Sequence, residues 1–260
     1  MSSLEPWQPA VYLKFGRERT QPSVDLAARI EVDGVRRVLD IGCGPGNSTG
    51  VLKARWPAAH ITGLDSSPEM IGRAKADYPD GDWVVADIRE WHPGQSCDVV
   101  FSNATLHWVP EHERLIPRLF DMVRRGGAIA AQVPSVQDSP VHRAARRLAE
   151  TGGWSRVLAR GQEALTWHSE VFYYDQLAPL STRVELWHTT YYHLMSSHQE
   201  IIQWYSGSGL KAYLSRLSSE REREDFKEAV LAACQGDYPV LRDGKVLFPF
   251  KRFFMVAYRA

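Results

Sequence analysis

Residues Val38–Gly46, with the sequence VLDIGCGPG, decide the fold class. An apolar run of branched side chains stops at a glycine-rich segment, which is typical of a buried strand followed by a tight turn. Apolar positions at Val51 and Leu52 then indicate a helix, with Asn47 or Ser48 as its cap. We therefore predict a strand–loop–helix unit. Its glycines let a ligand approach the backbone, and its helix start offers free N–H groups.

Further short apolar runs follow this unit along the chain. The predicted strands are His60–Asp65, Trp83–Asp87, Cys97–Asn103 and, after a turn at Gly126–Gly127, Ala128–Val133. Helical stretches separate them, and the first opens at Ser66–Glu69 with a serine cap and an early proline. Strands that alternate with helices indicate right-handed βαβ units and a parallel sheet.

Beyond Pro134 the alternation lapses. Mainly helical residues precede a predicted strand at 183–191, helices at 197–206 and 219–234, a loop around 246–248 and a last strand at 253–258. We predict a single α/β domain over residues 1–260. Its expected parts are a helical cap (1–34), a cofactor-binding core (35–134), a helical lid insertion (135–182) and C-terminal strands and helices (183–260).

Composition excludes several classes of protein. The 260 residues carry 31 Lys and Arg against 31 Asp and Glu, and 44% are hydrophobic. This is typical of a globular chain and not of a disordered one, and zero net charge disfavours a nucleic-acid partner. We find no apolar run of membrane length, no signal segment, and no metal-ligand or Cys-x-x-Cys spacing. We expect a cytoplasmic monomer or weak homodimer without metal or membrane partner.

Two acidic residues end neighbouring predicted strands. Asp65 can accept two hydrogen bonds from a ribose diol, and Asp87 can accept an adenine amino group while Ile88 covers the ring. Ligands in such sheets bind at the carboxyl ends of the strands, so the pair predicts a nucleoside site. The glycine loop lacks the Lys-Ser/Thr of a P-loop, which disfavours a triphosphate. Either aspartate alone would fit a helix cap equally well.

These segments resemble class I S-adenosylmethionine-dependent methyltransferases. The matching pieces are Val38–Gly46, Leu64–Met70, Ala86–Ile88 and Asn103–Val109. The resemblance implies a Rossmann-like fold, with a mostly parallel seven-stranded sheet, an antiparallel last strand and a helical lid insertion. It implies S-adenosyl-L-methionine as cofactor. The residues that it assigns to cofactor binding are Asp40, Gly42, Cys43, Gly44, Gly46, Asp65, Ser66, Met70, Asp87, Ile88 and Asn103.

The chain also resembles a narrower family, the trans-aconitate 2-methyltransferases. The matching pieces are Tyr12–Phe15 with Arg19, Leu106–Pro110, Val184–Tyr191, Asp237–Pro239 and Phe248–Ala257. This resemblance implies methyl-ester formation on a carboxylate of trans-aconitate or a similar small anionic acid. A carboxylate is ionised at neutral pH, so we expect no general base and no catalytic residue beyond groups that orient the reactants.

Recognition of a triacid favours arginine forks and aromatic walls. The substrate-binding candidates are Tyr12, Arg19, His107, Trp108, Trp187 and Arg252. Several have a second interpretation. Arg19 could lie in solvent, Arg252 on the surface, and His107 in the core, while Trp187 and His188 must point to opposite faces of their strand. Tyr173 and Tyr174 fit either a lid or its core.

Other functions remain open from the sequence. A hydroxyl or amine acceptor would need a base, and His107 or His188 would then gain importance. A protein that binds the cofactor without catalysis is also compatible with the loop and both acids. An RNA or protein methyltransferase is disfavoured by the zero net charge.

Overall fold

The computed structural model describes residues 16–151, 153–158 and 165–260. Tyr12 and the other residues before 16 lie outside this part of the chain. The chain divides into two compact units, which are described separately. Of the described residues, unit 1 contains those up to Arg19, those within Ser135–Leu165, and Thr190–Arg252. Unit 2 contains Thr20–Pro134, Thr166–Thr189 and Phe253–Ala260.

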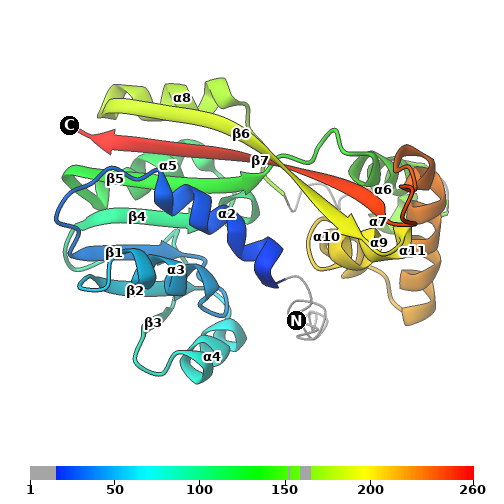
Figure 1. The fold of residues 1–260 in the computed structure, drawn as a ribbon, viewed down its shortest axis with the longest axis horizontal. Helices are drawn as coiled ribbons and strands as arrows, with labels where there is room; N and C mark the ends of the chain where they lie inside the picture. Colours follow the sequence, from blue (N-terminus) through cyan, green and yellow to red (C-terminus); the bar gives the residue numbers. More distant parts are fainter. Residues whose placement is uncertain (1–15, 152, 159–164) are drawn as a thin grey trace. The chain divides into compact units, whose positions relative to one another are not determined.

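A seven-stranded sheet has the order β3-β2-β1-β4-β5-β7-β6. Its strands are β1 (Arg37–Ile41), β2 (His60–Asp65), β3 (Asp82–Val85), β4 (Cys97–Asn103), β5 (Val123–Pro134), β6 (Ser181–Met195) and β7 (Val246–Arg259). The strands β1 to β5 pair in parallel, and β7 runs opposite to its neighbours (Figure 1). The predicted Rossmann-like sheet with an antiparallel last strand is confirmed.

The register brings the predicted ligand-binding segments to one edge of the sheet. Asp40 on β1 lies opposite Gly63 on β2 and Phe101 on β4. The strand order reverses at β1, because β2 lies on one side of it and β4 on the other. Such a switch point leaves a crevice beyond the carboxyl ends of the strands, where ligands bind.

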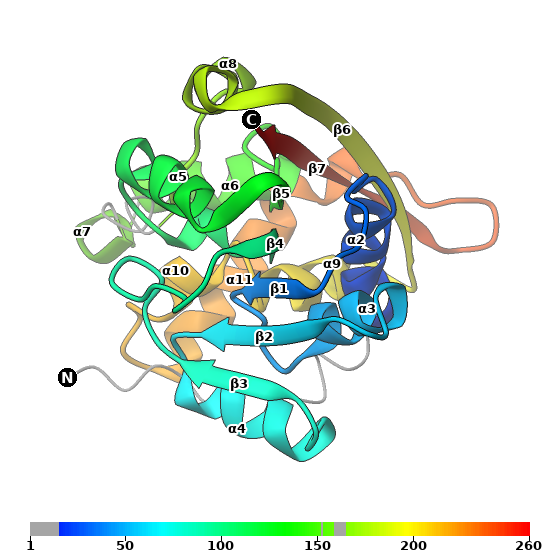
Figure 2. The same cartoon turned by 90° about the vertical axis from the view of Figure 1, so that its left-hand side faces the viewer.

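Helices cover both faces of the sheet in unit 2. On one face lie α2 (Gly16–Ala28), which begins in unit 1, and α3 (Asn47–Arg55); α5 (His112–Asp121) lies on the other (Figure 2). Further helices are α4 (Pro68–Asp77), α8 (Glu170–Leu177) and the 3-10 turns η1 (Leu106–Trp108) and η3 (Ala178–Leu180). Apolar side chains from β1, β4 and α5, including Leu39, Val100 and Leu119, form the buried core.

Unit 1 is mainly helical. Its elements are α6 (Pro140–Glu150), α7 (Ser155–Leu158), α9 (His198–Ser206), α10 (Lys211–Leu214), α11 (Glu220–Cys234) and η4 (Gln235–Asp237), with parts of β6 and β7. A capping box of Ser219 and Glu222 starts α11, and Phe226 and Val230 bury its apolar face. In the described residues, no helix is long and apolar enough to cross a bilayer.

Local boundaries depart from the sequence prediction at four places. Gly46, with φ of 95°, caps α3 in place of Asn47 or Ser48, and no side chain takes part in the cap. The third strand ends at Val85, so Asp87 lies just beyond it. The expected turn at Gly126–Gly127 lies inside β5. Gly127 packs closely against the backbone of Asp98, and a Cβ built on it would lie 2.5 Å from the Asp98 carbonyl oxygen.

The fourth departure is β7, which is one continuous strand from Val246 and not a loop followed by a short strand. By contrast, the predicted start of α4 is confirmed. Ser67 accepts a hydrogen bond from the amide of Met70, and Pro68 occupies the first turn. Tyr173 of the predicted insertion belongs to the core, where it is 1% exposed and bonded to His112, whereas Tyr174 is exposed.

Candidate cofactor site

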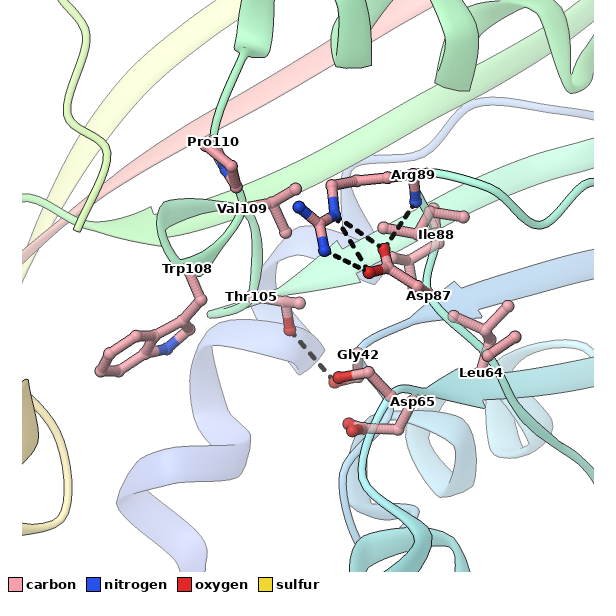
Figure 3. Close-up of a pocket in the computed structure, with 13 residues that line it drawn as sticks. Gly42, Leu64, Asp65, Asp87, Ile88, Arg89, Thr105, Trp108, Val109 and Pro110 are labelled. Carbon is pink, nitrogen blue, oxygen red and sulfur yellow. Dashed lines mark hydrogen bonds and ion pairs between the residues drawn. The ribbon is translucent and has the colours of Figure 1, made fainter. Parts of the chain in front are cut away.

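A cavity of about 230 Å³ lies at the carboxyl ends of β1 and β2 (Figure 3). All of its lining residues belong to unit 2, and they are Ile41, Gly42, Leu64, Asp65, Ser66, Ala86, Asp87, Ile88, Arg89, Thr105, Trp108, Val109 and Pro110. The cavity is therefore formed by the loop after each strand, as expected for the switch point of a doubly wound sheet.

The glycine loop is held against the neighbouring strand. The amides of Gly42 and Cys43 both donate to the carbonyl of Leu64, at 2.7 and 3.0 Å. Gly42 has φ of 66°, a left-handed conformation that favours glycine. Thr105 donates its hydroxyl to the Gly42 carbonyl, and a Cβ built on Gly42 would lie 2.1 Å from the Thr105 side chain. Only glycine leaves room for the loop and for a ligand beside it.

Asp65 holds the loop and still has capacity for a ligand. One carboxylate oxygen accepts the amide of Gly44 at 2.9 Å, and the other accepts the amide of Ser67 at 2.9 Å. Each oxygen of a carboxylate can accept about two hydrogen bonds. One acceptor position on each oxygen therefore remains for the two hydroxyls of a ribose, so the residues present fit a nucleoside cofactor.

Asp87 is engaged by a neighbouring arginine. The backbone amide and Nε of Arg89 donate to Oδ1 of Asp87, while Nε and a terminal nitrogen donate to Oδ2 (Figure 3). These bonds lower the pKa of the Asp87 carboxyl. Three N–H groups of Arg89 thus occupy most of the acceptor positions of the two oxygens, so an adenine amino group must compete with the guanidinium for this aspartate.

Asp40 lies behind the loop and is completely buried. One of its oxygens accepts the hydroxyls of Ser48 and Thr49, at 2.7 and 2.6 Å, and so ties β1 to the first turn of α3. Burial raises the pKa of this carboxyl to about 6, against the lowering effect of the two hydroxyls. In this arrangement Asp40 shapes the loop from behind and has no surface toward the cavity.

The segment after β4 closes the cavity on a third side. The side-chain oxygen of Asn103 is buried without a hydrogen-bond partner among the described residues. Ala104 follows in a left-handed conformation, with φ of 56°, which is a strained state for alanine. Trp108 is 38% exposed and lines the cavity, whereas His107 is buried with its ring stacked on Trp167. The 3-10 turn that follows thus presents Trp108 to the cavity and buries His107.

Sequence comparison relates this chain to known enzymes. A family model described as "Methyltransferase domain" matches residues 38–127. Trans-aconitate 2-methyltransferases of Escherichia coli O139:H28 and of Shigella flexneri are each 42% identical to the chain over 258 residues, which is 98% of this chain and 99% of theirs. The chain belongs to the trans-aconitate 2-methyltransferase family. It is an S-adenosylmethionine-dependent methyltransferase.

Solved structures show the same fold. The YcgJ protein of Bacillus subtilis has a TM-score of 0.58 at 14% identity, and the match covers 92% of this chain and 99% of that one. Phosphoethanolamine N-methyltransferase 2 of Haemonchus contortus, solved with S-adenosyl-L-methionine, has a TM-score of 0.57 at 15% identity, with 92% of this chain and 53% of that one covered. At these identities the likeness shows the fold alone.

The structure brings part of the predicted cofactor set to the cavity of this family member. Gly42, Asp65, Ser66, Asp87 and Ile88 line it. Gly44 reaches it through its hydrogen bond to Asp65, and Gly46 caps α3. Asp40 and Cys43 are buried and do not line the cavity, and Met70 lies on α4. Burial, and then the charges of Asp40 and Asp65, raise the pKa of the Cys43 thiol well above its usual range, which favours the protonated thiol.

The predicted substrate residues are scattered over the chain. Among the candidates that the structure describes, Trp108 lines the cavity and the others do not. Trp187 lies elsewhere in unit 2, with its ring stacked on Phe254 at 5.0 Å between centroids and the Arg29 guanidinium over it. Arg19 and Arg252 belong to unit 1, and Tyr12 is outside the described residues.

Sequence reasoning missed several lining residues. Thr105, Val109 and Pro110 all follow β4, in or beside the segment that the resemblance had singled out, and Arg89 lies two positions after Asp87. The signal available was position alone, because any side chain just beyond the carboxyl end of a strand faces the crevice. Neither a threonine nor an exposed arginine is a residue type that by itself indicates a place in the lining of a binding cavity.

Removing the Arg89 side chain will tighten cofactor binding. Arg89→Ala frees acceptor positions of Asp87, and because the ion pair that is lost is exposed and weak, the gain in affinity should be at most roughly fivefold. Calorimetric titration with S-adenosylhomocysteine measures the change. The control is Arg73→Ala, which removes a comparable exposed ion pair between Arg73 and Asp77. Weaker binding by Arg89→Ala would contradict the prediction and indicate that the guanidinium contacts the cofactor.

The buried carboxyl of Asp40 will make folding stability depend on pH. Its pKa is raised to about 6 in the folded protein, so its favourable contribution is complete below the unfolded value of 3.8 and is lost as the pH rises through about 6. Asp40→Asn keeps an acceptor for Ser48 and Thr49 and does not titrate. Relative to this variant, wild type should lose on the order of 3 kcal/mol between about pH 4 and about pH 7.5.

Urea unfolding of both proteins at the two pH values measures this difference. The variant corrects for every other titrating group, because those groups are shared. An equal difference in unfolding free energy at both pH values would show that Asp40 does not bind a proton in this range.

Proposed function

We propose that this protein transfers a methyl group to a carboxylate of trans-aconitate or a similar small polycarboxylic acid and forms a methyl ester. The observation that carries this proposal is the end-to-end match to trans-aconitate 2-methyltransferases, which leaves no large segment of either chain unaccounted for. The lining of the cavity supports it. Among the described lining residues, the ionisable side chains are Asp65, Asp87 and Arg89, and all three already take part in hydrogen bonds. An acceptor that arrives ionised needs no base from this set.

The proposed roles of the residues follow from their positions. When bound, S-adenosylmethionine supplies an electrophilic methyl group on a sulfonium. Asp65 binds the ribose hydroxyls, and Asp87 binds the adenine once Arg89 has moved aside. Asn103 holds the methionyl end with its buried side-chain oxygen. Trp108 forms a wall that excludes water from the reacting groups.

Catalysis on this proposal is a matter of position. Methyl transfer is an in-line displacement, in which the carboxylate oxygen forms a bond to the methyl carbon as the bond to sulfur breaks. Holding the oxygen about 3–3.5 Å from that carbon supplies most of the acceleration. No proton needs to move, so activity should not require the histidines near the site.

Methyl transfer from radiolabelled S-adenosylmethionine tests the proposal. Trans-aconitate is the main acceptor, with cis-aconitate, citrate and isocitrate beside it. A methyl ester releases its label as methanol in mild base, whereas an ether or a methylated amine does not. We expect base-labile label on trans-aconitate. Label that resists base, or transfer only to a hydroxyl or amine compound, would overturn the carboxyl acceptor.

A further inference from the structure

Unit 1 contains a histidine between two arginine–aromatic pairs. The guanidinium of Arg19, on α2, lies 5.0 Å from the ring centroid of Trp204 on α9. The guanidinium of Arg252, on β7, lies 4.9 Å from the ring centroid of Phe250. The His193 ring, on β6, packs 4.6 Å from Trp204 and 6.2 Å from Phe250. Segments far apart in the sequence thus bring two cations and an imidazole around one pair of rings.

All members of this cluster except the half-buried Arg19 are buried. Arg252 is 5% exposed, His193 is 7% exposed, and Trp204 and Phe250 are buried. The Nε2 atom of His193 is buried without a hydrogen-bond partner among the described residues. Because an unsatisfied buried polar atom is costly, this atom points to a group that supplies the missing hydrogen bond.

The charges that act on His193 have the same sign. Burial has the largest effect on its pKa, followed by Arg252 and then Arg19, and together they lower it to about 4. Tyr191 stacks near the ring from the same strand, 6.5 Å away, and Phe248 packs 6.3 Å away from β7. The imidazole is therefore neutral at pH 7 and can donate one N–H in a field of positive charge.

We propose that Arg19, His193 and Arg252 form a carboxylate-binding site in unit 1. Guanidinium groups match the two oxygens of a carboxylate, and a neutral imidazole adds a hydrogen bond without a charge. The aromatic rings exclude water and strengthen both interactions. This inference rests on the proposed function, because the acceptor class is a polycarboxylate. The inference adds His193 to the substrate-binding residues that the sequence suggested. The imidazole of His193 also gives a direct readout of binding.

The imidazole of His193 reports occupancy of this site. The experiment uses the full chain with S-adenosylhomocysteine and follows the nitrogen NMR signals of the histidines over pH, with His193→Gln identifying the signal. A carboxylate beside the ring favours the imidazolium, so added trans-aconitate should raise the pKa of His193 by about one unit or more. Binding of trans-aconitate seen by calorimetry without any change at His193 would overturn the proposal.

Other anions separate this proposal from the proposed function. If trans-aconitate is not methylated but citrate, propane-1,2,3-tricarboxylate or succinate shifts the His193 signal, the site stands and the acceptor differs. If no carboxylate shifts it at millimolar concentrations, the site is wrong, whatever the activity. An equal response to inorganic phosphate or sulfate would replace the carboxylate site by a general anion site.

Variants test the two arginines. Arg19→Gln and Arg252→Gln should each weaken carboxylate binding roughly tenfold or more while leaving the affinity for S-adenosylhomocysteine unchanged. Each should also raise the pKa of His193 in the absence of carboxylate, because a nearby positive charge is removed. Arg252→Lys keeps the charge without the fork and should restore part of the affinity.

The matched control is Arg55→Gln. Arg55 also lies over a tryptophan, with its guanidinium 5.1 Å from the Trp56 ring centroid, but it is exposed on α3. Carboxylate binding should be unchanged in this variant. If Arg252→Gln does not fold, the Arg19→Gln variant still tests the proposal, because Arg19 is only half-buried. Wild-type carboxylate affinity in a folded Arg19→Gln protein, with an unshifted His193, would contradict the site.

Discussion

Asp65→Ala will lose most of its affinity for the cofactor while the fold persists. The substitution removes both acceptors for a ribose and releases the amides of Gly44 and Ser67, which shape the loop and the cap of α4. Hydrogen bonds to a charged group are worth about 1.5–3 kcal/mol each, so losing two predicts a dissociation constant raised roughly 100-fold or more. Titration calorimetry with S-adenosylhomocysteine measures it, and circular dichroism checks the fold.

Two further variants locate this effect. Asp65→Asn keeps one carbonyl oxygen as an acceptor, so its affinity for S-adenosylhomocysteine should lie between those of Asp65→Ala and wild type. Asp77→Ala removes an exposed aspartate on α4 that pairs with Arg73, and it should bind the cofactor normally. If Asp65→Ala binds S-adenosylhomocysteine as tightly as wild type does, the ribose assignment is wrong and Asp65 only supports the loop.

Gly42→Ala will destabilise the protein and abolish cofactor binding. The new Cβ would lie 2.1 Å from Thr105, and alanine at φ of 66° is strained. The left-handed conformation costs about 1–2 kcal/mol, and forcing apart packed groups costs about 1–3 kcal/mol more. Displacement of the loop also moves the edge of the cavity. Thermal unfolding and calorimetry measure the two effects.

Controls separate steric overlap from backbone strain. Gly72→Ala lies in α4 where a Cβ meets open space, and it should be neutral or slightly stabilising. In the double variant Gly42→Ala/Thr105→Gly, the overlap with the threonine is removed while the strained φ remains. About half of the unfolding free energy that Gly42→Ala loses should therefore be regained. A Gly42→Ala protein that unfolds at the wild-type temperature and binds the cofactor would refute the close packing of Gly42 on Thr105.

The cavity that forms the candidate cofactor site could be anticipated from the sequence because its signals are local. The strand, glycine loop and helix after Val38 are continuous in the chain, and the acids Asp65 and Asp87 close or follow their own strands. Hydrophobic runs and turn residues carry this information over a few positions. The cap formed by Ser67 is of the same kind. Parallel pairing then places the carboxyl ends of the strands at the same edge of the sheet.

Other features depend on contacts that no local pattern contains. Thr105 meets Gly42 from 63 positions away. Asp40, which the motif suggested as a ligand, is buried and accepts the hydroxyls of Ser48 and Thr49. Burial of a side chain depends on what packs over it, and the residue type alone does not specify that neighbour.

By itself, the sequence determined the Rossmann-like fold, the glycine loop and the two acids beside it, because hydrophobic period and turn chemistry act between near neighbours. Only the tertiary structure decided that Thr105 closes the loop and that Asp40 lies behind it. It also decided that His193 packs beside both Trp204, which Arg19 covers, and Phe250, which Arg252 covers. These contacts join residues from distant segments, and they form only when the packing of strands and helices brings those segments together.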